Sequence, residues 1–361
     1  MRVLVVAGAC GDLTAREVGE ALRQGWLEGN PSAEVDLAVG SDGSGGLLDA
    51  IEAVQGGVRE VVTVTSAAGP AVPALILLSS GTAYIQAGDA VGVRADATME
   101  SVTSGSSAGV GQLILAARDA GARTVIIETA PAAVLDAGWG AIAALAGLRP
   151  EPFDPTVLSD DAAEIVRAAR ANLAGLSLVV VTSELAPCRG LKGPASALRH
   201  QFGPEESQAL ETRLAPLISA LDAVGAPRQD LLAGPSALLS SILGSGSGGG
   251  LGLGVLVLGG AIAPGATWVG QAIGLARRAE LADLVVVGSE QLDPVEASSG
   301  LTAVAAVAAR EAGVAVLALS PTVLLERRGL AAAGISSASR VEPGTEGLVA
   351  GAARAARGWA W

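Results

Sequence analysis

Three aspartates occupy loop positions from which a carboxylate could take part in catalysis. Asp42 lies in a glycine-rich turn after an apolar run, Asp136 lies two residues before a glycine, and Asp293 directly precedes a proline. Such a carboxylate can accept the proton of a reacting hydroxyl or bind Mg²⁺. It can also simply stabilise a turn or cap a helix. Asp42, Asp136 and Asp293 are therefore candidate catalytic residues.

The tract 244–254 is the best candidate for a phosphate-binding loop. Glycines allow backbone N–H groups to converge on an anion at the start of a helix. The strand that should precede such a loop is not clear here, so a flexible or tightly packed glycine turn is the alternative. The predicted phosphate-binding residues in the tract are Gly246, Gly248, Gly249, Gly250 and Gly252.

Arg189 and Lys192 form a small basic loop in an acidic protein, and we predict that they bind an anion; a solvated loop is the alternative. Lys192 is the only lysine and His200 the only histidine. Chemistry that needs two lysines is therefore excluded, and so is a metal site rich in histidine. Cys10 and Cys188 are the only cysteines, which excludes a disulfide scaffold.

Composition and charge restrict the class of protein further. The chain has 361 residues, of which 50% are hydrophobic and 16% charged, so it can bury a large core and is not a disordered chain. Its formal net charge is 23 − 36 = −13. Nucleic acids and anionic membranes attract basic surfaces, so we expect neither as a partner. A small-molecule anion remains the predicted ligand, and a homo-oligomer is compatible with the sequence.

Two segments superficially resemble targeting or membrane signals. The first ten residues imitate a lipoprotein signal, but their apolar run is too short and reads better as a buried strand. The stretch 231–276 carries no charged residue, yet many glycines and two prolines interrupt it. We therefore predict a cytoplasmic protein without a membrane span.

Strand and helix patterns alternate at both ends of the chain, which predicts an α/β fold with a parallel sheet. Between the ends, the strand-like runs 60–65, 74–78 and 83–86 have no helix between them and predict antiparallel hairpins. We predict two domains: a Rossmann-like α/β domain from residues 1–58 and 255–361, and an inserted mixed α/β domain from residues 59–254 that includes the glycine tract.

Several segments, in one order along nearly the whole chain, resemble motifs of the type-I glycerate kinase family. They are LTAREV at 13–18, SDGSGG at 41–46, GVGQLI at 109–114, DAGAR at 119–123, the glycines of 246–252 and ADLVVVG at 282–288. No single motif is specific, but their shared order supports the resemblance. It implies a two-domain glycerate kinase-like fold with a parallel Rossmann-like sheet and an inserted mixed α/β domain.

The sequence departs from the family pattern at several positions that carry polar or charged groups. The family's D-S-x-K falls on Ala7, Gly8 and Cys10, its acidic residue in the SDGSGG segment falls on Gly45, and no lysine lies around Gly300. Segment 130–138 keeps only the aspartate and one glycine of its motif, and in segment 183–188 the acid is shifted to position 184. Much of the charge that phosphoryl transfer needs is therefore missing.

Two functions follow from the resemblance and its departures. The first is a kinase that uses ATP and Mg²⁺ to phosphorylate a hydroxyl of glycerate or a similar small hydroxy acid. In that case Asp42 or Asp293 binds Mg²⁺ or accepts the hydroxyl proton, and the glycine tract binds phosphate. The second is a catalytically degenerate paralogue, a pseudoenzyme that keeps the fold as a binding or assembly module. The missing lysines favour the second function.

Overall fold

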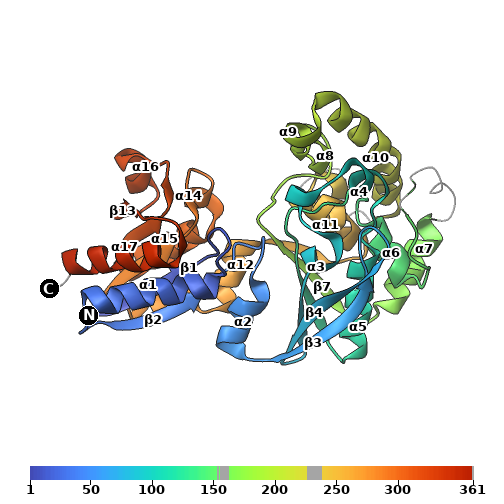
Figure 1. The fold of residues 1–361 in the computed structure, drawn as a ribbon. Coiled ribbons are helices and arrows are strands. Elements are labelled where there is room, and N and C mark those ends of the chain that lie inside the picture. Colours follow the sequence, from blue (N-terminus) through green and yellow to red (C-terminus); the bar gives the residue numbers. More distant parts are fainter. Residues whose placement is uncertain (153, 155–161, 226–237, 360–361) are drawn as a thin grey trace, which may run out of the picture. The chain divides into compact units, whose positions relative to one another are not determined.

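The computed structural model describes residues 1–152, 154, 162–225 and 238–359. The chain divides into two compact units (Figure 1). Unit 1 comprises Met1–Gly56 and Pro264–Trp361, and unit 2 comprises Gly57–Ala263. The sequence predicted that the inserted domain ends at residue 254, whereas unit 2 ends at Ala263. Helix α11 (Ser247–Val257) belongs to unit 2, and strand β8 (Ala261–Pro264) is hydrogen-bonded in the sheet of that unit.

Unit 1 is built on a five-stranded parallel sheet with the order β13-β11-β9-β1-β2. Its strands are β1 (Arg2–Ala7), β2 (Glu34–Val39), β9 (Leu284–Gly288), β11 (Ala315–Ser320) and β13 (Ser337–Arg340). A separate parallel pair joins β10 (Gln291–Leu292) and β12 (Thr322–Val323). The predicted α/β fold is confirmed, and both ends of the chain contribute strands to one sheet, as expected.

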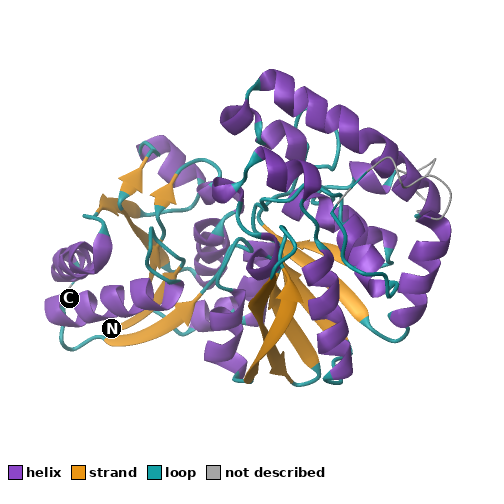
Figure 2. Cartoon of the chain, turned by 45° about the vertical axis from the view of Figure 1, so that its right-hand side comes forward, coloured by secondary structure: helices purple, strands orange, loops and turns teal. Residues whose placement is uncertain are grey.

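Hydrophobic runs place the central strands of this sheet in the core. The side chains of residues 3–6 are at most 1% exposed, as expected for a parallel strand that is covered on both faces. Helices pack beside the sheet of each unit (Figure 2). Those of unit 1 are α1 (Ala15–Gly29), α2 (Leu47–Gln55), α12 (Gly265–Ala272), α13 (Leu275–Glu280), α14 (Glu296–Ser299), α15 (Leu301–Ala312), α16 (Arg327–Ala332) and α17 (Gly344–Gly358).

Helix α1 begins with a capping box and packs tightly along α17. The side chain of Thr14 accepts a hydrogen bond from the backbone N–H of Glu17, and the Glu17 carboxylate accepts one from the N–H of Thr14. A Cβ at Gly25 would lie 2.1 Å from the carbonyl oxygen of Val349 in α17. Glycine at this position therefore allows the two helices to approach each other closely.

Unit 2 is built on a six-stranded mixed sheet with the order β3-β4-β5-β6-β7-β8. Strands β3 (Val58–Thr65), β4 (Ala71–Ser79) and β5 (Thr82–Gln86) pair antiparallel, which confirms the predicted hairpins. Strands β6 (Thr124–Glu128) and β7 (Ser177–Thr182) then continue parallel to β5. The carboxyl ends of β6 and β7 are therefore neighbours at one edge of the sheet.

The helices of unit 2 are mostly short, with α10 as the long exception. They are α3 (Gly88–Val91), the 3₁₀ turn η1 (Arg94–Asp96), α4 (Met99–Ser104), α5 (Ala108–Asp119), α6 (Trp139–Leu145), α7 (Ala162–Asn172), α8 (Pro194–Ala197), α9 (Arg199–Phe202), α10 (Pro204–Val224), the 3₁₀ turn η3 (Leu239–Ser241) and α11. Among the described residues, no helix combines the length and the apolarity that crossing a membrane requires. Within the uncharged stretch 231–276, residues 231–237 lie outside the described part of the chain.

Candidate functional site

The carboxyl ends of the parallel strands in unit 1 surround a pocket of about 300 Å³. Gly8 and Ala9 follow β1, Asp42 lies in the turn after β2, Glu290 follows β9, and Glu296 begins α14. Open α/β sheets bind ligands at this edge. All charged side chains among the described lining residues are acidic, so the pocket favours hydroxyl donors and cations over anions.

Asp42 is the predicted catalytic residue that the structure places in this pocket. Its Oδ1 accepts hydrogen bonds from the N–H and the hydroxyl of Ser44, at 2.9 and 2.6 Å. Gly43 has φ 92°, a left-handed conformation that glycine adopts readily, and its N–H donates to the hydroxyl of Ser41. Asp42 thus stabilises a turn and lines the pocket. Its participation in catalysis or in Mg²⁺ binding stays a prediction.

Asp293 caps the start of α14. Its Oδ1 accepts hydrogen bonds from the N–H groups of Val295 and Glu296, at 2.9 and 2.8 Å, and its Oδ2 accepts one from Gln291. The backbone N–H of Glu296 makes the largest contribution to lowering the pKa of this carboxyl, because hydrogen bonds favour the ionised form. Asp293 is not among the described residues that line the pocket. Glu296, three residues further along the chain, does line it.

Glu296, which the sequence did not single out, lies over the start of α15. Its Oε1 accepts a hydrogen bond of 2.8 Å from the N–H of Thr302. A Cβ at Gly300 would lie 1.8 Å from Oε2 of Glu296, so the carboxylate occupies the space beside this glycine. Burial raises the pKa of Glu296, and the negative charge of Asp42 adds to the effect.

Replacing Glu296 with glutamine should stabilise the protein near pH 7. Because burial raises its pKa above the unfolded value of about 4.3, the native state binds this proton more tightly, and stability falls as pH rises through the native pKa. Glutamine keeps an acceptor for Thr302 without the buried charge. Urea unfolding from about pH 3.5 to pH 8 should show that Glu296→Gln has a higher free energy of unfolding than the wild type, and that this difference disappears below the unfolded pKa of the glutamate. Exposed Glu28→Gln is the control, and a gain independent of pH would contradict this assignment.

Asp136 lies in unit 2 and is fully buried, with 1% of its surface exposed. Its Oδ2 accepts hydrogen bonds from the N–H and hydroxyl of Ser107, at 2.7 and 2.8 Å, and from the N–H of Gly140, at 3.0 Å. Its Oδ1 accepts one from the N–H of Gly138, also at 3.0 Å. Burial raises the pKa of this carboxyl and the four donors oppose that effect. These bonds hold the starts of α5 and α6 in place.

The glycine tract forms a tightly packed turn into α11. Gly248, Gly249 and Gly250 have φ of 60°, 70° and 94° in succession, and all three are buried. A Cβ at Gly249 would lie 1.8 Å from the carbonyl oxygen of Val134. The packed glycine turn considered from the sequence is therefore present, and it leaves no room for a side chain at this position.

The backbone N–H of Gly248 already has an acceptor within the protein. It donates to Oε2 of Glu184 at 3.3 Å, and the guanidinium of Arg94 pairs with Oε1 of the same carboxylate. Glu184 lies just beyond β7, and Arg94 lies in η1. The carboxylate thus occupies a place at the tract where the sequence predicted an external phosphate.

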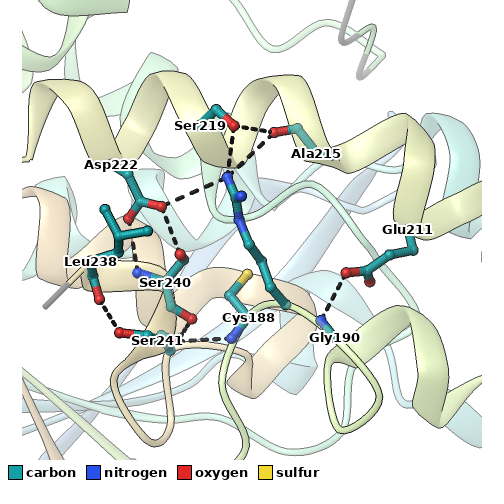
Figure 3. A network of polar contacts seen from close by, with 11 residues as sticks. Cys188, Gly190, Glu211, Ala215, Ser219, Asp222, Leu238, Ser240 and Ser241 are labelled. Atoms are coloured by element: carbon teal, nitrogen blue, oxygen red, sulfur yellow. Dashed lines mark hydrogen bonds and ion pairs between the residues drawn. The ribbon is translucent and has the colours of Figure 1, made fainter.

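The guanidinium of Arg189 contacts α10, at Ser219 and Asp222, which are both labelled in Figure 3. It donates to the hydroxyl of Ser219 at 2.8 Å and pairs with the carboxylate of Asp222 at 3.7 Å. Asp222 also accepts hydrogen bonds from the N–H and hydroxyl of Ser240, at 2.9 and 2.6 Å. Arg189 thereby joins the loop to α10, and its binding of an anion stays a prediction.

The loop that carries Arg189 and Lys192 does lie beside the glycine tract. The N–H of Gly246 donates to the carbonyl of Ala186 at 3.0 Å, and Lys192 is exposed. The thiol of Cys188 is buried next to these segments, and desolvation raises its pKa, so it is a poor nucleophile. Binding of an anion by Lys192 stays a prediction.

In the part of the chain that it describes, the structure shows no preassembled site for Mg²⁺ or ATP. Among the described residues, no group of three or more histidine, cysteine, aspartate or glutamate side chains is placed to hold a metal ion. The pocket of unit 1 offers acidic side chains to the phosphates of a nucleotide, and the N–H of Gly248 in unit 2 donates to Glu184.

Comparison with known proteins places these features in a family. The model of the glycerate kinase family matches residues 5–358. An uncharacterized protein of Mycobacterium bovis and one of Mycobacterium tuberculosis are each 31% identical over 350 residues, covering 94% of this chain and 83% of the relative. The crystal structure of putative glycerate kinase 2 from Salmonella typhimurium LT2 has the same fold, with a TM-score of 0.74, 21% identity and coverage of 99% of this chain and 97% of that one. This chain belongs to the glycerate kinase family.

Proposed function

We propose that the protein is a catalytically degenerate member of its family, a binding module whose pocket takes a small hydroxylated ligand. The observation that carries the proposal is the charge of the pocket in unit 1. Its described charged lining residues are Asp42, Glu290 and Glu296, and all three are acidic. Ligand hydroxyl groups can donate hydrogen bonds to these carboxylates, whereas phosphate or carboxylate groups meet like charge.

The positions that match the family's D-S-x-K motif support the loss of phosphoryl transfer. Gly8 lines the pocket without a side chain, and Cys10 is 5% exposed with its pKa raised by burial. Phosphoryl transfer depends on cations and N–H groups that neutralise charge on the phosphates. Removing such a cation costs about 10³- to 10⁵-fold in rate.

An assay that couples ADP release to D-glycerate tests the proposal. We expect turnover at least about 1000-fold below the 1–100 per second of ordinary kinases. Turnover in the ordinary range would contradict the proposal.

A second candidate function is ATP-dependent phosphorylation of glycerate or a similar small hydroxy acid with Mg²⁺. Its support is the position of Asp42 at the carboxyl edge of the parallel sheet, from which a carboxylate can accept the proton of a hydroxyl. In that case Asp42→Asn should abolish the measured turnover while the protein stays folded. The cytoplasmic localisation and the homo-oligomer remain predictions.

A further inference from the structure

Unit 2 has its own set of polar groups at the carboxyl edge of its parallel strands. Thr129 follows β6, Glu184 follows β7, and Gly248 lies in the left-handed glycine turn within the first residues of α11. A Cβ at Gly248 would lie 3.2 Å from Cβ of Thr129, and the N–H of Thr129 donates to the carbonyl of Val181 in β7. These segments therefore meet at the edge where sheets of this type bind ligands.

Two hydrogen-bond donors converge on one carboxylate at this edge, and two buried hydroxyl groups near it lack a partner among the described residues. The N–H of Gly248 and the guanidinium of Arg94 both donate to the single carboxylate of Glu184. The hydroxyl groups of Thr129 and Ser247 are 0% exposed and have no hydrogen-bond partner among the described residues. Buried polar groups normally have partners, so these two hydroxyl groups remain available to form hydrogen bonds with a bound group.

The Glu184 carboxylate has the contacts that a bound oxyanion would have. One of its oxygens accepts from the backbone N–H of Gly248, which lies in the left-handed glycine turn of α11, and the other pairs with an arginine. Backbone N–H groups in such turns and arginine side chains both bind phosphate groups in proteins. The side chains of Glu184 and Arg94 are only 18% and 24% exposed, so water screens this pair weakly.

We propose that Glu184 is an internal anion that excludes external phosphate groups from the glycine tract, and that it sets the ligand specificity of this edge. A phosphate group must displace the carboxylate from both Gly248 and Arg94, and the displaced charge stays attached nearby. Removing the charge of Glu184 frees the N–H and the guanidinium for a phosphate oxygen. The inference concerns unit 2 alone and does not depend on the proposed function.

Titration calorimetry of the full chain with inorganic phosphate, and separately with Mg²⁺-free ATP, tests this inference. Glu184→Gln should bind phosphate groups at least about tenfold more tightly than the wild type, because it removes a like charge from the site. Higher affinity for both ligands indicates a site for any phosphate group. Higher affinity for ATP alone indicates a site that also requires the nucleoside. Adding Arg94→Gln to Glu184→Gln should abolish the gain.

Glu211→Gln is the matched control. Its Oε1 also accepts a hydrogen bond from a glycine N–H in unit 2, that of Gly190 at 2.8 Å. We expect phosphate affinity in this variant to equal that of the wild type. Thermal unfolding establishes that each variant is folded, and Glu184→Ala replaces Glu184→Gln if the latter does not fold. A folded Glu184 variant without a gain, or an equal gain in Glu211→Gln, would overturn the proposal.

Discussion

Replacing Gly249 with alanine should destabilise the protein by about 3 to 5 kcal/mol. The new Cβ would lie 1.8 Å from the carbonyl oxygen of Val134, and a backbone atom in a buried turn cannot move aside cheaply. The φ of 70° adds the cost of holding an L-residue in the left-handed region. Urea unfolding followed by circular dichroism measures the loss.

Gly259→Ala separates these two causes. Gly259 also has a positive φ, of 91°, but a Cβ there would have nothing within 4 Å. This variant should lose only about 1 to 2 kcal/mol, the cost of the backbone conformation. Equal losses in the two variants would show that the packing of the glycine tract is not what requires glycine at position 249.

Replacing Asp136 with alanine should cost about 3 to 5 kcal/mol of stability, because it leaves several buried donors without an acceptor. The carboxylate accepts hydrogen bonds from the N–H and hydroxyl of Ser107 and from the N–H groups of Gly138 and Gly140. No other acceptor is supplied when it is removed. The free energy of unfolding in urea at neutral pH measures the effect.

Asp293→Ala is the comparison for Asp136. Asp293 likewise accepts hydrogen bonds from two backbone N–H groups, those of Val295 and Glu296, but it is only partly buried. Water can replace its oxygens, so the loss should be about 1 kcal/mol, as for an ordinary helix cap. If Asp136→Ala were no more destabilising than Asp293→Ala, the structural role assigned to Asp136 would be wrong.

The fold could be predicted from the sequence because its signals are local. The apolar run at residues 3–6 and the capping box of Thr14 and Glu17 both specify elements that the structure contains. The three strand patterns without intervening helices gave the antiparallel part of unit 2. The boundary after Ala263 was harder to place, because β8 joins the sheet of unit 2 only through pairing with distant residues.

The candidate site was only partly predictable. Asp42 lies at the sheet edge as expected, since a turn directly after a parallel strand must be there. The network that binds Arg189 depends on how residues 215–222 of α10 pack against its loop, which no local pattern encodes. The role of Glu296 had one indirect signal in the sequence, namely that Gly300 lies where the family has a lysine nearby. No signal in the sequence indicated the role of Arg94.

Single-turnover phosphoryl transfer tests the central claim most directly, that this chain keeps the family fold without its chemistry. The protein in excess is mixed with ATP labelled at the γ-phosphate, Mg²⁺ and D-glycerate, and labelled phosphoglycerate is measured over time beside an active glycerate kinase. We predict a rate constant at least about 1000-fold below that of the active enzyme. Stoichiometric labelled product within seconds would contradict the claim.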